Sequence, residues 1–187
     1  MVKTLPFDEL NTFQKALEDE ITLYGKVSTP KKVFDTVSDI LLYIYLLGYD
    51  AVNETFGTAL KPSADKQGDA VFKDIAGKTF LDRIMEYSES GSAEEIVRVA
   101  ETEMTRVYNQ AVLDAGSEYQ DKSGRVVNKI WLTQNDEKVR DTHSYLEGME
   151  IPLGEEFWTY DGDHALAPGG FENADNNVNC RCQLDIV

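Results

Sequence analysis

The two cysteines of the chain, Cys180 and Cys182, lie one residue apart. Together with the two histidines, His143 and His164, they supply the ligand types of a tetrahedral zinc site. Their spacing does not match the paired Cys-x-x-Cys and His-x-x-x-His units of a zinc finger. We therefore expect two reduced, buried thiols that pack as small apolar groups. A zinc site assembled from distant segments and a catalytic cysteine paired with His143 stay open as alternatives.

Three polar residues, Asp136, Arg140 and His143, follow one another at intervals of four and three. On a helix this spacing places them on one face, and we predict a helix over residues 134–146 that is capped by Thr133. In a functional interpretation Arg140 would bind an anion and His143 would act as acid, base or ligand. We favour an internal network, in which Asp136 pairs with Arg140 and His143 bonds to a neighbouring loop.

The stretch Glu101-Thr102-Glu103 matches the Glu-x-Glu pattern of ADP-ribosyltransferases. It falls in the middle of a predicted helix, where residues two apart point in different directions. We therefore interpret it as a solvated helix face. The sequence contains no GxGxxG, Walker, GxSxG or HExxH motif.

Composition and charge exclude several classes of protein. Among 187 residues, 18 basic and 34 acidic side chains give a formal net charge of −16, which repels nucleic acid. The most apolar run, residues 40–47, is too short to span a bilayer, and the first residues lack the apolar core of a signal peptide. We expect a soluble protein made in the cytosol.

The first two-thirds of the sequence has helical periodicity. Apolar residues recur three and four apart over residues 7–24, 30–56, 79–88 and 93–115, each of which we predict to be a helix. Residues 57–77 are polar and rich in glycine and proline, which indicates a loop or linker. At Gly116 the composition changes, and we place a turn-rich boundary there.

The remainder of the chain is typical of a compact α+β domain. Residues 126–132, 155–160 and 179–186 have the β-branched and aromatic content of strands, and they flank the predicted helix at 134–146. We predict an α+β fold with a helical region at residues 1–118 and a small domain at residues 119–187. In that domain one short antiparallel sheet would carry one helix, and the last strand would bring the cysteines beside His143.

An ordered set of residues in this C-terminal part resembles a known family. The set consists of Lys-x-Trp, then Asp-x-x-Val-Arg-x-x-His, a glycine, an aromatic strand and a terminal Asn-Cys-Arg-Cys. The pattern and the helix that precedes it, residues 77–187 in all, resemble the phage Mu F-like family of head morphogenesis proteins. The loop at residues 161–170 departs from the family pattern. The residues that carry the resemblance are Lys129, Trp131, Asp136, Arg140, His143, Gly148, Asn179, Cys180, Arg181 and Cys182.

The resemblance implies a minor head (capsid) protein of a tailed bacteriophage or prophage. Such a protein would be made in the cytoplasm of the bacterial host, enter the virion, and act near the portal in head morphogenesis or in early DNA delivery. Its expected partners are portal or capsid proteins, with no specific nucleic acid and no membrane. The resemblance implies no established enzyme activity, and we expect no cofactor and no metal. The motif residues would then form the scaffold of the domain.

Two other functions fit the same residues. Arg140 and His143 could serve a nuclease-like or ADP-ribosyltransferase-like effector domain. Alternatively, the cysteines and histidines could hold the zinc of an interaction module unrelated to phage.

Overall fold

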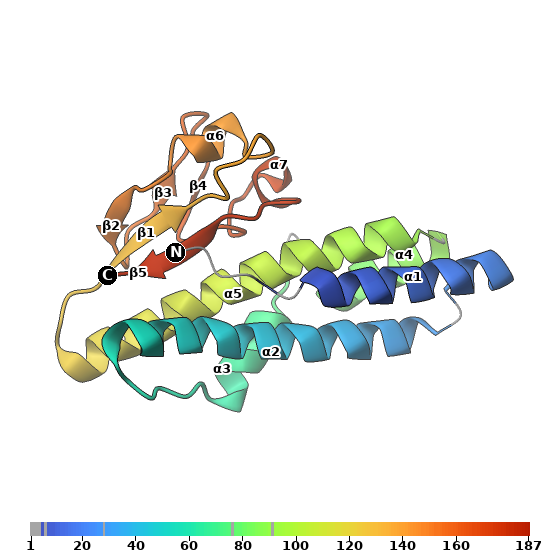
Figure 1. Ribbon diagram of the computed structural model, residues 1–187, viewed down its shortest axis with the longest axis horizontal. Helices are drawn as coiled ribbons and strands as arrows, with labels where there is room; N and C mark the ends of the chain where they lie inside the picture. The colour runs from blue at the N-terminus through green and yellow to red at the C-terminus, as the bar shows by residue number, and fades with distance from the viewer. Residues whose placement is uncertain (1–4, 6, 28, 76, 91) are drawn as a thin grey trace.

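The computed structural model describes residues 5, 7–27, 29–75, 77–90 and 92–187. It has the predicted α+β architecture, with helices followed by short antiparallel strands. Figure 1 shows the long helices lying along one another, with the strands and two short helices gathered against one side of them.

The first two helices have the predicted bounds. Helix α1 covers Phe7–Tyr24 and helix α2 covers Pro30–Phe56. Proline at the start of α2 has the backbone angle that a first helical turn needs, and Gly57 ends the helix in the left-handed conformation at φ 64°. Helix α2 buries Val37, Leu41 and Ile44 completely, which explains its nearly continuous apolar middle.

The predicted loop at residues 57–77 is wrong in part, because it contains helix α3, Ala64–Val71. The Ser63 hydroxyl accepts a hydrogen bond from the Lys66 amide and caps the helix. The Gln67 side chain donates to the Leu42 carbonyl of α2, and Ala70 and Val71 are buried. Tertiary contacts thus stabilise a helix whose glycine and polar residues indicated a loop.

Helix α4 covers Phe80–Ser90, and helix α5 covers Ala93–Ser123. The Ser92 hydroxyl caps α5 by accepting from the Glu95 amide. The turn predicted from Gly116 onward is wrong, since α5 runs through this position and ends at Gly124, φ 69°. A Cβ on Gly116 would lie 3.3 Å from side-chain atoms of Leu153 and Ile186, so the absence of a side chain serves close packing there.

Among the described residues the strands form two small sheets, so the single predicted sheet is wrong. In the first sheet the order is β2 (Glu150–Pro152), β1 (Asn128–Leu132) and β5 (Gln183–Ile186), with both pairings antiparallel. The second pairs β3, Phe157–Trp158, with β4, His164–Ala165. The last strand begins after the cysteines, which therefore lie on the segment that leads into β5. A short helix, α7 (Ala174–Asn177), precedes that segment.

The helix predicted over residues 134–146 is also wrong. Only α6, Asp141–Ser144, is helical there. The Thr133 hydroxyl accepts from the Asn135 amide, the Asp136 carboxylate accepts from the Lys138 amide, and Asn135 has a left-handed φ of 51°. A residue with the left-handed backbone of Asn135 does not continue a right-handed helix, and the Asp136 carboxylate occupies the Lys138 amide that a helix would otherwise use.

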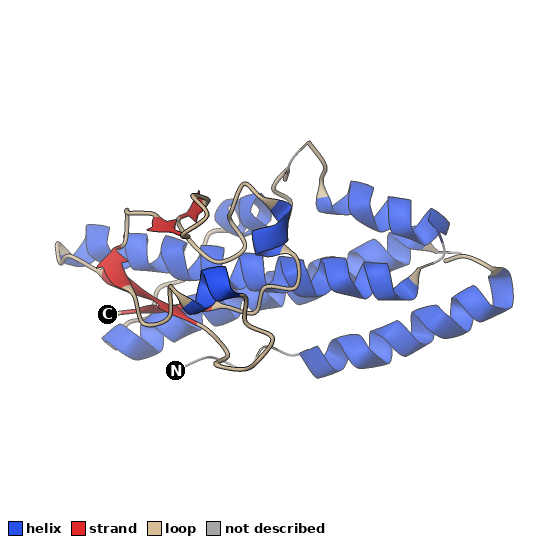
Figure 2. Cartoon of the chain, turned by 90° about the horizontal axis from the view of Figure 1, so that it is seen from above, coloured by secondary structure: helices blue, strands red, loops and turns tan. Residues whose placement is uncertain are grey.

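Helix α5 is the element that joins the two parts of the chain. It packs against α2 on one side and against β5 on the other, as Figure 1 shows, and in the view from above in Figure 2 the strands overlie the long helices. The Asn109 side chain of α5 is fully buried; its amide nitrogen donates to the carbonyls of Pro168 and Cys182, and its oxygen accepts from the Leu184 amide. Within the described residues, no helix has the length and apolar character that a bilayer crossing requires.

Candidate functional site

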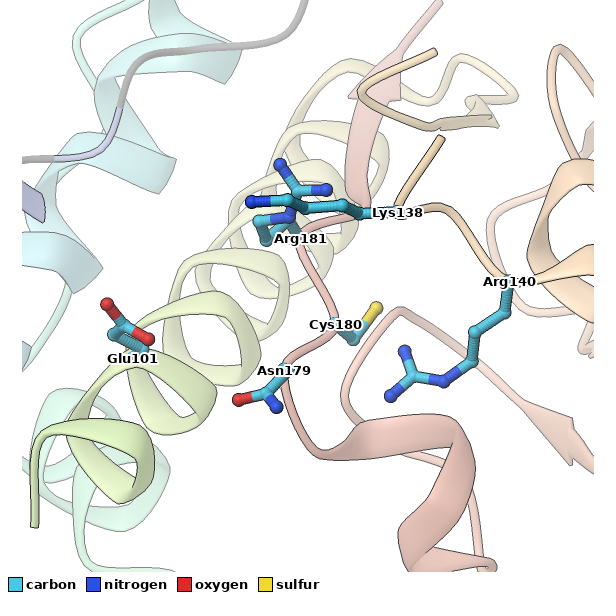
Figure 3. A pocket seen from close by; sticks show the side chains of 6 residues that line it. All are labelled: Glu101, Lys138, Arg140, Asn179, Cys180 and Arg181. Carbon is cyan, nitrogen blue, oxygen red and sulfur yellow. The ribbon is translucent and has the colours of Figure 1, made fainter. Parts of the chain in front are cut away.

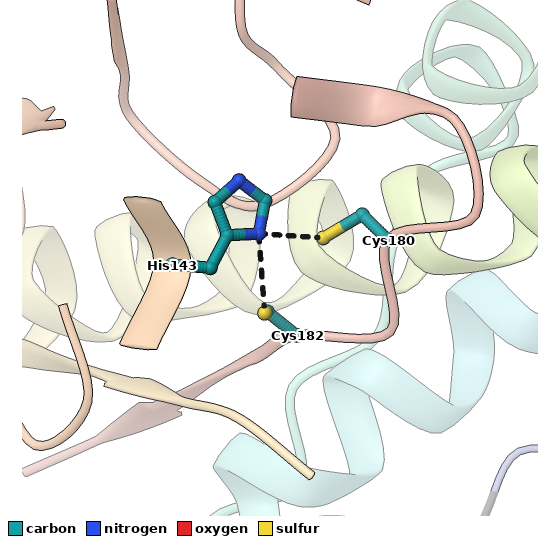
Figure 4. A group of neighbouring side chains, drawn as sticks. All are labelled: His143, Cys180 and Cys182. Carbon is teal, nitrogen blue, oxygen red and sulfur yellow. Dashed lines mark hydrogen bonds between the residues drawn. The ribbon is translucent and has the colours of Figure 1, made fainter. Parts of the chain in front are cut away.

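Three chemically reactive side chains meet in the interior of the C-terminal part. The sulfur of Cys180 lies 3.6 Å and that of Cys182 lies 3.5 Å from one atom, Nδ1 of His143 (Figure 4). All three residues are buried, with relative exposures of 3%, 4% and 1%. The segment that carries the cysteines thus lies beside α6, as the sequence predicted.

The backbone before the cysteines turns sharply to place them. Asn179 takes a left-handed φ of 58°, which asparagine tolerates better than most residues. Its amide donates to the Thr102 hydroxyl of α5, and the Cys180 amide donates to the Asn177 carbonyl. This turn, rather than strand alternation, brings both sulfurs to one side.

Aromatic rings fix the orientation of the imidazole. The Trp131 ring meets the His143 ring edge-on at 5.4 Å between centroids, and Phe171 stacks on it, also at 5.4 Å. The tryptophan is itself fully buried. The other ring nitrogen of His143, Nε2, is buried and has no hydrogen-bond partner among the described residues.

The two thiols shift each other's pKa in opposite directions. A hydrogen bond from Cys182, with a further contribution from His143, lowers the pKa of the Cys180 thiol well below its usual value. The same hydrogen bond, together with burial, raises the pKa of the Cys182 thiol.

The loop before α6 is tied to the cysteine segment by arginines. The Arg181 guanidinium donates two hydrogen bonds of 2.8 Å to the Asp136 carboxylate and lowers its pKa. Arg140 donates to the Val178 carbonyl, and the Gln134 amide donates to the Arg181 carbonyl. The predicted pairing of Asp136 with Arg140 is wrong, because without a helix at 134–140 the two do not share a face.

Two further motif residues lie on β1 and on the turn after α6. The Lys129 ammonium is buried, donates to the Leu166 carbonyl at 2.7 Å, and lies 5.2 Å from the centre of the Phe157 ring. Burial lowers the pKa of Lys129 to about 8. Gly148 has a left-handed φ of 72°, and its amide donates to the Trp131 carbonyl at 2.8 Å.

An open cavity of about 580 Å³ lies between α5 and the cysteine segment. In Figure 3, Glu101 on α5 lies to one side, Arg140 to the other, and the Asn179–Arg181 stretch between them. Partial burial raises the pKa of Glu101, while the charge of Arg181 opposes this shift. The six lining residues, three of them basic, are Glu101, Lys138, Arg140, Asn179, Cys180 and Arg181.

The two acids of the Glu-x-Glu stretch have different environments. Glu103 is buried, with ion pairs to Arg83 at 2.7 Å and to Arg106 at 2.8 Å, so the predicted solvated face is wrong for this residue. Only Glu101 reaches the cavity. The second histidine, His164, lies away from the cysteines, on β4 against the Trp158 ring and 3.2 Å from Glu156.

Sequence reasoning missed the polar residues that α5 buries. Glu103, Arg106 and Asn109 follow one another at intervals of three, on the same helix as the buried Val107 and Ala111. The sequence signal for these buried residues is that polar side chains recur at helical spacing within an apolar face. Polar groups in such positions need hydrogen-bond partners inside the protein.

Comparison with known proteins places residues 68–185 in a family of phage head morphogenesis domains. The family model described as "Phage Mu protein F like protein" matches residues 68–185, and the chain belongs to this family. No solved structure matches the chain.

A curated relative is the "NAD(+)--arginine ADP-ribosyltransferase EFV" of Enterococcus faecalis (strain ATCC 700802 / V583). It is 33% identical over 114 residues, which cover 59% of this chain and 23% of the relative. The chain therefore spans less than a quarter of that protein's length.

Proposed function

We propose that this chain is a minor head protein of a tailed bacteriophage or prophage, which contacts portal or capsid proteins during head morphogenesis. The observation that carries the proposal is that the charged family residues are engaged within the chain itself. The Lys129 side chain donates a hydrogen bond to the Leu166 carbonyl, and the Arg140 side chain donates one to the Val178 carbonyl. The Arg181 side chain donates to the Asp136 carboxylate. A motif that stabilises its own domain suits a protein whose shape, rather than turnover, is its function.

The charge of the chain supports the same role. A net charge of −16 disfavours adhesion to packaged DNA, because the acidic surface and the nearby phosphates repel each other within the range that salt leaves unscreened. Recognition of a portal or capsid protein then depends on local surface complementarity.

The test is deletion of the gene in an inducible prophage strain, followed by electron microscopy and mass spectrometry of gradient-purified particles. We expect peptides of the chain in wild-type virions at low copy relative to the major capsid protein, and defective heads in the deletion strain. Normal infectious heads without the gene would overturn the proposal.

Complementation adds a matched pair of variants. Lys31→Ala changes an exposed side chain on α2 and should restore particle yield. Trp131→Ala removes a fully buried ring that packs on His143 and Phe157, and should not restore it, because such a truncation costs about 3–5 kcal/mol.

A second candidate function is ADP-ribosyl transfer. Two observations favour it: the relative that carries this name, and the basic cavity to which Glu101 and Arg140 contribute. Two observations count against it, since Glu103 is buried and paired with Arg83 and Arg106, and His143 is only 1% exposed.

The enzyme candidate is tested by incubating the purified chain with NAD and an arginine-like acceptor and measuring nicotinamide release. We expect no release above the background of a chain-free control. Release that disappears in both Arg140→Ala and Glu101→Gln, with folding retained, would replace the head-protein proposal.

A further inference from the structure

Two sulfurs converge on a single nitrogen, and hydrogen bonding accounts poorly for this arrangement. His143 Nδ1 carries either one proton or one lone pair, so it forms one good hydrogen bond at a time. Yet the sulfurs of Cys180 and Cys182 lie at nearly equal distances from it, 3.6 and 3.5 Å. A metal ion bound by all three atoms would hold each sulfur at such a near-equal separation from the nitrogen.

The distances fit such an ion. With Zn–S bonds of about 2.3 Å and Zn–N bonds of about 2.05 Å, tetrahedral angles place each sulfur about 3.5–3.6 Å from the nitrogen. The two observed separations match that edge, and all three ligand atoms lie within 4.8 Å of one another. In Figure 4 both side chains and the ring nitrogen point into the same space.

The space and the charge at His143, Cys180 and Cys182 also suit a metal ion. A hollow of about 10 Å³, the scale of a single atom or water, borders His143, Cys180 and Cys182. Two buried thiolates would be costly without a cation, and one divalent ion neutralises both. The aromatic rings of Trp131 and Phe171 already hold the imidazole in one plane, so little ordering is left to the metal.

We propose that His143, Cys180 and Cys182 form a zinc site, in which Nδ1 and the two sulfurs bind Zn²⁺. Each thiol releases one proton on binding, and the remaining imidazole proton stays on Nε2. No fourth His, Cys, Asp or Glu joins the group among the described residues. The fourth position is taken by a water molecule from the adjoining cavity, which Cys180 also lines.

The proposed zinc site differs from the sequence-based expectation that Cys180 and Cys182 are reduced thiols packed as small apolar groups. His164, the other sequence candidate, lies on a separate sheet against Trp158 and takes no part. The inference does not depend on the head-protein role, because metal content is measured on the purified chain alone.

The experiment is elemental analysis of the full chain, purified with reductant and without chelator. We expect one zinc per chain. Cobalt(II) added to metal-free protein should give a sulfur-to-metal charge-transfer band in the near ultraviolet and intense visible bands of a tetrahedral ion. Both measurements use the wild-type chain, so their outcome does not depend on whether a variant folds.

Variants locate the ligands. Cys180→Ser, Cys182→Ser and His143→Asn should each weaken metal binding at least about tenfold, as loss of a ligand or of its support typically does. His164→Ala is the matched control and should keep one zinc per chain.

Three outcomes would overturn the proposal. One is protein with two titratable thiols that neither retains zinc nor gives cobalt bands. Another is zinc that survives in all three ligand variants. The third is a Cys180–Cys182 disulfide under reducing purification.

Discussion

At the scale of single residues, the C-terminal part depends on polar groups buried with internal partners. Lys129 is a clear case, since its ammonium lies in the core with one carbonyl and one aromatic ring as neighbours. Burial disfavours the charged form, which is why its pKa falls from 10.5 to about 8.

This pKa predicts a pH dependence with a definite sign. Between pH 8 and 10.5 the unfolded chain binds more protons at Lys129 than the folded chain, so stability rises with pH. Between pH 8 and 10.5 we expect the free energy of unfolding of the wild type to rise by about 3 kcal/mol relative to that of Lys129→Met. Urea unfolding of both proteins at the two pH values measures it.

The comparison with Lys129→Met is needed because tyrosines act in the opposite direction. Burial raises the pKa of Tyr49 to about 12, and the folded state therefore loses stability at high pH as unfolded tyrosines ionise. This contribution is common to both proteins and cancels in the difference. An unchanged difference between pH 8 and 10.5 would contradict the prediction.

The buried carboxylate of Glu103 gives a second prediction. Glu103→Gln leaves Arg106, 6% exposed, without its anion, and we expect a loss of about 3 kcal/mol in unfolding free energy. Urea titration monitored by circular dichroism measures it. Glu101→Gln, two residues earlier on the same helix, lacks such a partner pair and should change stability by less than about 0.5 kcal/mol. Equal effects of the two variants would argue against a buried ion network.

At the scale of elements, the contact between α2 and α5 depends on a glycine. A Cβ on Gly48 would lie 2.5 Å from the Ala111 Cβ and 2.8 Å from the Tyr108 carbonyl oxygen. The two helices can therefore approach this closely only because position 48 has no side chain.

We predict that Gly48→Ala destabilises the protein by about 2 kcal/mol, since overpacking outweighs the gain in helix propensity. Gly68→Ala in α3 is the matched control, because a methyl group at that position would meet nothing within 4 Å and the helix should gain about 0.5–1 kcal/mol. Thermal unfolding of both variants measures the contrast. Stabilisation by Gly48→Ala would mean that the helices are farther apart.

Arg106 shows how one element can stabilise another. Its guanidinium pairs with Glu103 and also donates to the Ala70 carbonyl, within the last turn of α3. A cationic donor at a helix C-terminus satisfies a carbonyl that has no partner in the helix. This bond helps to explain why α3 forms inside a segment whose composition indicated a loop.

At the scale of the whole molecule, α5 belongs to both halves. It packs on α2, and through Asn109 it holds the segment that carries Cys182 and Leu184. The sequence-based division at residues 118 and 119 falls inside α5, and it stays a prediction.

The shared helix predicts one cooperative unfolding transition. Both tryptophans, Trp131 and Trp158, lie in the C-terminal part, so fluorescence reports on that part while far-ultraviolet circular dichroism reports mainly on the helices. We expect the two urea transitions to coincide, as a single folding unit requires. Two separated midpoints would contradict the prediction.

A fragment of residues 119–187 extends this test. It lacks Asn109 and most of α5, so the carbonyls and amide that Asn109 satisfies would lose their partner. We expect the fragment to show no cooperative transition and no fixed near-ultraviolet signal. A sigmoidal unfolding curve would mean that the C-terminal part folds alone.

The sequence by itself determined the long helices and the family. Periodic apolar residues and local signals, such as proline at the start of α2 and Ser92 before α5, act over a few residues and are visible without a fold. The ordered set from Lys129 to Cys182 identified the family for the same reason, since order and spacing are properties of the chain.

Tertiary structure alone decided where short segments fold and which side chains meet. Helix α3 forms through contacts with α2 and α5, and the residues before α6 are held by bonds to Arg181 and Val178 instead of forming a helix. The meeting of His143 with Cys180 and Cys182 bridges 37 and 39 residues of sequence. No local pattern encodes such a distance, because it depends on how the whole chain packs around α5.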